Sequence, residues 1–65
     1  MSDYRDQAAS RLGLELEAYR VAVAEYARTV GTKRDAPSRI RALMGLYEAQ
    51  ERLEAAQYAY TAATI

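Results

Sequence analysis

The sequence contains no cysteine, no histidine, no tryptophan and no phenylalanine, and has only one proline and three glycines. Without cysteine it cannot form a disulfide, and without cysteine and histidine it cannot form an ordinary structural zinc site. A chain of 65 residues buries only a marginal core unless it is cross-linked or oligomeric. Oligomerisation is therefore the remaining route to a stable fold.

The chain also lacks an excess of charge of either sign. Nine Lys and Arg residues balance nine Asp and Glu residues, so no overall field attracts the protein to nucleic acid or to anionic lipid. The charges are nevertheless uneven along the chain. Between Glu25 and Glu48 five cations accompany a single acid, Asp35, a local charge of 5 − 1 = +4, and the remainder carries −4. The five cations are Arg28, Lys33, Arg34, Arg39 and Arg41.

Long apolar runs are missing as well. No stretch approaches the roughly 18 consecutive apolar residues of a membrane span. The first residues, MSDYRDQ, do not combine a basic segment with an apolar one, as a secretory signal would. We therefore expect a cytoplasmic protein with no membrane partner.

The pattern that is present predicts two helices joined by one turn. The segment GTKRDAPSR, residues 31–39, combines Gly31, which suits a left-handed helix stop, with Pro37, which suits a helix start. The prediction is a single all-α domain covering residues 1–65, with a helix over about 3–30, a turn over 31–37 and a second helix over about 38–63. A connection this short makes the helices antiparallel neighbours, which is a two-helix hairpin.

Apolar residues recur at alternating spacings of three and four on both helices, as in a helix–helix seam. The second helix carries alanine at every seventh position from Ala42 to Ala63. In an antiparallel pair these small residues lie opposite tyrosine and leucine of the first helix, although alanine is also simply a good helix former. The predicted seam consists of Leu12, Leu16, Tyr19, Val23, Tyr26, Ala42, Leu46, Ala49, Leu53, Ala56 and Tyr60, and Ala9 and Val30 extend its pattern.

A second stripe on the second helix lies about a quarter turn from the alanine row. A lone hairpin would leave it in water, whereas two hairpins packed as a four-helix bundle would cover it. We therefore expect a homodimer, most simply an antiparallel one, because head-to-tail packing keeps the basic turns apart. The two glutamines in the stripe either hydrogen-bond across a dimer core or are partly exposed. The predicted partner face is Ile40, Leu43, Tyr47, Gln50, Gln57 and Tyr58.

The residue types do not favour catalysis. The commonest general base, thiol nucleophile and transition-metal ligands are absent, and the glycines are isolated rather than grouped into a phosphate-binding loop. Carboxylates alone could act as an acid and base pair, but their neighbours indicate a solvated helix face. We expect no enzyme activity, no cofactor and no metal. The carboxylates concerned are Glu15, Glu17, Glu48, Glu51 and Glu54.

Two functions from different classes remain. The first is a protein–protein interaction module, an adaptor, assembly or regulatory protein that acts as a homo-oligomeric bundle. The second is nucleic-acid binding: in size and layout the chain resembles the ROP class of plasmid copy-number regulators, whose hairpins dimerise into four-helix bundles and bind RNA. That resemblance is architectural and carries no motif across. It implies that the cations at the turn contact phosphates, whereas a solvated loop, the partner's acids or a bound anion would also account for them.

Overall fold

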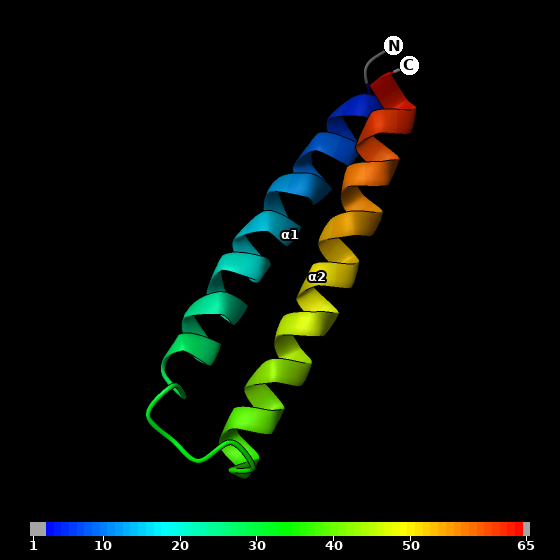
Figure 1. The fold of residues 1–65 in the computed structure, drawn as a ribbon. Helices are drawn as coiled ribbons and strands as arrows, with labels where there is room; N and C mark the ends of the chain where they lie inside the picture. The colour runs from blue at the N-terminus through cyan, green and yellow to red at the C-terminus, as the bar shows by residue number, and fades with distance from the viewer. Residues whose placement is uncertain (1–2, 65) are drawn as a thin grey trace.

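The computed structural model describes residues 3–64 and consists of two long helices that lie side by side (Figure 1). Helix α1 covers Asp3–Ala27 and helix α2 covers Pro37–Thr64. They run antiparallel and pack against each other along their length, with both chain ends at one end of the molecule and the turn at the other (Figure 1). The predicted all-α hairpin is confirmed. Neither helix is both long enough and apolar enough to cross a membrane over the residues described.

Helix α1 ends earlier than the sequence pattern suggested, at Ala27 rather than near residue 30. The chain leaves the helix through tight turns, in which the amide of Thr29 donates to the carbonyl of Tyr26 at 2.9 Å. The hydroxyl of Thr29 donates to the same carbonyl at 2.7 Å. The expectation of a left-handed Gly31 is wrong, because no glycine here has a positive φ. Tight turns and a threonine hydroxyl satisfy the helix end instead.

Helix α2 begins at Pro37, whose missing amide hydrogen costs nothing in the first turn of a helix. The carbonyl of Ala36 accepts from the amides of Arg39 and Ile40, each at 3.0 Å. Residues before a proline avoid the helical region, so Ala36 is a natural boundary. At the other end of the hairpin, Asp3 and Asp6 stand in the first turn of α1, where the helix dipole favours negative charge.

The hairpin encloses very little. Among the described residues only Ala8, Ala49 and Ala56 are buried, at 9%, 8% and 0% exposure, and no large side chain is fully buried. The molecule measures 51 × 13 × 12 Å along its principal axes, so it is a rod two helices wide. A rod of this kind has a line of contact and no interior.

Candidate interaction surface

The seam of α2 lies along the alanine row. Ala49 and Ala56 are buried, and Ala42, Leu46 and Leu53 are half-buried. Tyr60 and Ala63 continue the same line of half-buried residues toward the C-terminal end. Every second position that α2 turns toward α1 is therefore an alanine, which lets the helix axes approach closely.

The seam of α1 differs from the prediction at every second position. Leu12, Tyr19 and Tyr26 are half-buried, but Leu16 and Val23 are 40% and 42% exposed. The positions that face α2 are one residue earlier, because Ala8 is buried and Glu15, Ala22 and Thr29 are half-buried, whereas Ala9 and Val30 are exposed. One residue is a rotation of 100° about a helix, so the prediction placed a neighbouring stripe in the contact. We use the term seam residues for the following set: Ala8, Leu12, Glu15, Tyr19, Ala22, Tyr26, Thr29, Arg39, Ala42, Leu46, Ala49, Leu53, Ala56, Tyr60 and Ala63.

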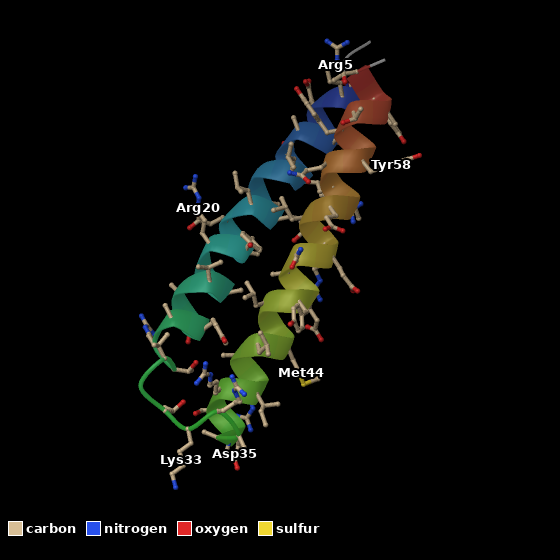
Figure 2. The ribbon with its side chains drawn as sticks, viewed as in Figure 1. Arg5, Arg20, Lys33, Asp35, Met44 and Tyr58 are labelled. Atoms are coloured by element: carbon tan, nitrogen blue, oxygen red, sulfur yellow. The ribbon has the colours of Figure 1, made fainter. Side chains whose placement is uncertain are left out.

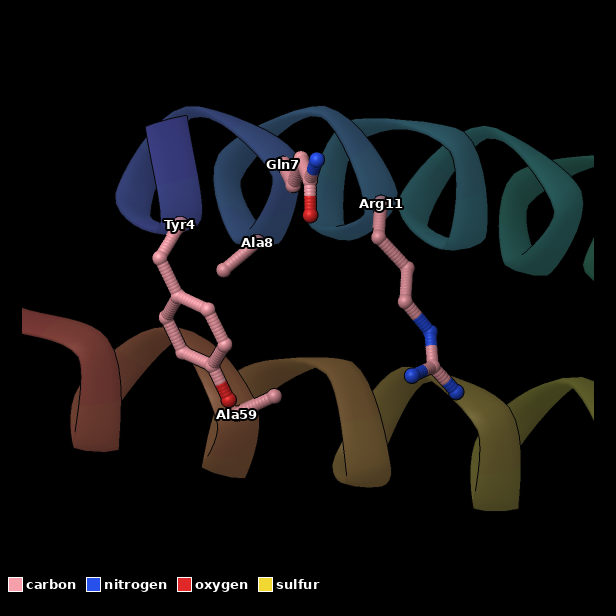
Figure 3. A pocket seen from close by; sticks show the side chains of 5 residues that line it. All are labelled: Tyr4, Gln7, Ala8, Arg11 and Ala59. Atoms are coloured by element: carbon pink, nitrogen blue, oxygen red, sulfur yellow. The ribbon is translucent and has the colours of Figure 1, made fainter. Parts of the chain in front are cut away.

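One side of the hairpin carries two open grooves between the helices. The groove near the chain ends surrounds Ala8, with Tyr4 and Arg11 reaching from α1 toward α2 on either side of it (Figure 3). The groove near the turn is lined by Glu25 of α1, by Arg28 just after that helix and, on α2, by Ser38, Arg41 and Gly45. We call this side the groove face. Besides Tyr4 and Gln7, it is lined by charged and small residues.

The residues that line the groove face show which residues lie on the opposite side of each helix. Some groove-lining residues are seam residues themselves. Each of the others, except Tyr4, comes immediately before a seam residue in the sequence. For example, Arg11 precedes Leu12, and Gly45 precedes Leu46. Residues that immediately follow seam residues therefore lie on the other side of both helices. That side carries Leu16 and Val23 of α1, and the following residues of α2: Ile40, Leu43, Tyr47, Gln50, Glu54 and Gln57. We call it the apolar face.

The apolar face contains most of the predicted partner residues. Leu43 is half-buried, while Ile40 and Tyr47 are 47% and 59% exposed. Sequence reasoning missed that α1 contributes Leu16 and Val23 to the same face, because it had placed them in the seam. Tyr58 does not belong to it: the side chain points outward from α2 and is 80% exposed (Figure 2). Arg20 follows a seam residue, but its side chain extends away from α2 (Figure 2).

The groove linings also give the register of the two helices. Ala8 of α1 and Ala59 of α2 lie nearly level across the groove near the chain ends (Figure 3), and in an antiparallel pair the numbers of level residues keep a constant sum, here 67. The turn-end groove contains residues with the same sum, Ala22 with Gly45 and Glu25 with Ala42. This sum places residue 16 of α1 level with residue 51 of α2. Leu16 and Gln50 are therefore at nearly the same height.

The cations at the turn are not equivalent. Arg39 is half-buried; its guanidinium lies 5.9 Å from the centre of the Tyr26 ring and donates to the carbonyl of Thr32 at 3.3 Å. Arg28 pairs with Glu25 at 3.4 Å, and both side chains are largely exposed. Lys33, Arg34 and Arg41 are exposed, and Lys33 projects from the turn into solvent (Figure 2). The helix dipole disfavours a cation in the first turn of α2. The Tyr26 ring and the Thr32 carbonyl offset that cost for Arg39.

Over residues 3–64 the structure brings together no group of three or more metal-ligating side chains. Gly13 and Gly45 are not in close contact with the opposite helix, because a methyl group added at either would find no atom within 4 Å beyond its chain neighbours and the nearby backbone of its own helix.

No protein-family model matches the chain, and no curated protein and no solved structure matches it either.

Proposed function

We propose that this chain is a non-enzymatic protein–protein interaction module that acts as a homo-oligomeric helical bundle. The observation that carries the proposal is the lack of a core: three alanines are the buried residues of residues 3–64, while large apolar side chains remain exposed beside the seam. Burial of apolar surface is the main favourable term in folding. A second molecule supplies what one hairpin lacks.

The surface area supports the same proposal. A compact folded protein of this mass exposes about 4,200 Å², whereas the hairpin exposes 5247 Å². The excess, about 1,000 Å² per chain, is comparable to the roughly 800 Å² that each partner contributes to a stable interface. An interface of ordinary size would therefore give the chain the burial of a compact domain.

RNA binding in the manner of the ROP class is the alternative. It depends on the cations at the turn, and two of the five are already engaged within the hairpin, Arg39 with Tyr26 and Arg28 with Glu25. Lys33, Arg34 and Arg41 remain for phosphate. Even with Arg28, whose side chain is exposed, four cations at one end of a chain with zero net charge form a weaker electrostatic footprint than nucleic-acid-binding domains present.

Sedimentation velocity at micromolar concentration tests the proposal. The expected species has twice the mass of the 7.3 kDa chain or a higher multiple of it. A folded monomer would overturn the proposal. A gel-shift titration with RNA tests the alternative: a shift that weakens steeply with salt, and with Lys33→Glu plus Arg34→Glu, would favour nucleic-acid binding instead.

A further inference from the structure

We propose that a second copy of this chain covers the apolar face head to tail, and that the two-fold axis relating the copies passes beside Leu16 and Gln50. The inference rests on the proposed function and adds the face, the direction and the register of the assembly. It follows from the position of the apolar face, the charges at the turn and the midpoints of the helices.

The position of the apolar face selects the surface. The groove face presents Arg11, Arg28 and Arg41 beside the seam, so covering it would remove cations from water. The apolar face presents Leu16, Val23, and, on α2, Ile40, Leu43 and Tyr47 beside the same seam. Its side chains are continuous with the half-buried leucines and tyrosines between the helices. A second hairpin placed there joins two narrow seams into one core.

The charges select the direction. The cations at the turn, Arg28, Lys33, Arg34, Arg39 and Arg41, are accompanied by one acid. Two hairpins packed with their turns together would place both of these sets at one end, where like charges repel. Packed head to tail, each turn instead lies beside Asp3 and Asp6 of the second copy, which stand in the first turn of α1.

The helix midpoints select the register. Helix α1 covers 25 residues, Asp3–Ala27, and its middle is residue 15. Helix α2 covers 28 residues, Pro37–Thr64, and its middle falls between residues 50 and 51. In a head-to-tail dimer with full overlap, each midpoint lies against its own copy. Leu16 and Gln50 are each within about one residue of a midpoint, are nearly level, and belong to the apolar face.

This arrangement gives Gln50 a specific partner. Its amide meets the amide of Gln50 in the second copy, and each side chain can donate to and accept from the other. An apolar contact between two copies of Leu16 accompanies it on the α1 side. This polar pair favours the register over slips of a few residues, which leave both amides without partners. A slip of seven residues would pair Gln50 with Gln57 instead, but it shortens the overlap of the helices.

Single-cysteine variants test the arrangement, since the native chain has no cysteine. Gln50→Cys and Leu16→Cys are each oxidised, or treated with a short bifunctional maleimide, at the concentration where the wild type is oligomeric. Glu51→Cys is the matched control, because it is one residue further along and exposed on another side of α2. We expect both apolar-face variants to form covalent dimers on the order of tenfold faster than the control, through the high effective concentration at the axis.

Other outcomes separate this inference from the proposed function. Cross-linking in a mixture of Leu16→Cys with Gln50→Cys, but in neither alone, would mean that the turns lie together and would overturn the head-to-tail direction. Equal rates for all three single variants in a sedimenting dimer would overturn the face and leave the interaction module standing. A monomer by sedimentation would remove both. Each variant is checked under reducing conditions, where it should sediment as the wild type does.

Discussion

The guanidinium of Arg39 lies 5.9 Å from the centre of the Tyr26 ring, so the first turn of α2 is tied to the last turn of α1. The same guanidinium donates to the carbonyl of Thr32 in the turn between them, at 3.3 Å. A cation in the first turn of a helix opposes the helix dipole. Here the ring and the carbonyl offset that cost and hold the turn closed.

Removing this cation should destabilise the hairpin more than removing its neighbour. We expect Arg39→Ala to lower the free energy of unfolding by about 0.5 to 1 kcal/mol, because the cation–π contact and the hydrogen bond are lost. Arg41→Ala removes an exposed cation two residues away and should change little. Urea unfolding followed by circular dichroism, at one fixed protein concentration, measures both. Equal losses in the two variants would contradict the role given to the Tyr26 contact.

The alanine row should reject larger side chains. Ala56 is fully buried and Ala49 is 8% exposed, so leucine at either site forces the helices apart. We expect Ala49→Leu and Ala56→Leu each to cost about 1 to 3 kcal/mol in the free energy of unfolding. Ala55→Leu, on an exposed neighbouring position, is the matched control and should be nearly neutral. If Ala55→Leu destabilised as much as Ala56→Leu, the row would not be the contact line.

Glu15 is the one acidic side chain in the seam, and its removal should stabilise the protein. It is half-buried, and over residues 3–64 no cation lies within ion-pair distance of it. Alanine here would match the small seam residues Ala8 and Ala22 and relieve the partial desolvation of a carboxylate. We expect Glu15→Ala to raise the free energy of unfolding by about 0.5 to 1 kcal/mol, as favourable single substitutions commonly do.

Glu17→Ala is the control for that gain, because Glu17 is exposed and both substitutions have nearly the same helix propensity. Chemical denaturation of the three proteins side by side makes the comparison. A loss of stability in Glu15→Ala alone would show that the carboxylate makes a favourable contact in the assembly.

Gly45 weakens α2 without a compensating contact inside the hairpin. A methyl group added at this position meets no atom within 4 Å beyond its chain neighbours and the nearby backbone of α2, and Gly45 has no positive φ. We therefore expect Gly45→Ala to stabilise the helix by about 0.5 to 1 kcal/mol. The midpoint of thermal unfolding should rise while the sedimentation coefficient stays unchanged, because Gly45 lines the groove face. A loss of oligomer in this variant would instead place the second copy there.

The two helices differ in how far their sequences reveal the contact. In α2 the alanine row and the leucines between them mark a single stripe, and the half-buried positions follow it. In α1 two adjacent stripes compete, one holding Leu16 and Val23 and the other holding Glu15 and Ala22. Hydrophobicity alone predicts that the stripe with Leu16 and Val23 faces α2. In the structure the stripe with Glu15 and Ala22 faces it, because the alanines let the helices approach closely and Leu16 is left to face outward.

The turn shows a different limit of sequence reading. Pro37 marks the start of α2 correctly, because the ring has a fixed preference for the first helical turn. Gly31 gives a misleading signal at the end of α1, where the hydroxyl of Thr29 donates to the carbonyl of Tyr26 and closes the helix. The contact between Arg39 and Tyr26 joins residues that are thirteen apart in the sequence, and no local sequence pattern predicts it. The apolar face could be identified only from the structure, because the groove-lining residues show which side of each helix lies opposite to it.

The most direct test of the account is the dependence of thermal unfolding on protein concentration. A fold completed by a second copy must gain stability by mass action, so the midpoint measured by circular dichroism should rise by several degrees between about 2 and about 200 µM chain. A midpoint that stays the same across that range, with full helicity throughout, would mean that one hairpin is stable alone and would contradict the account.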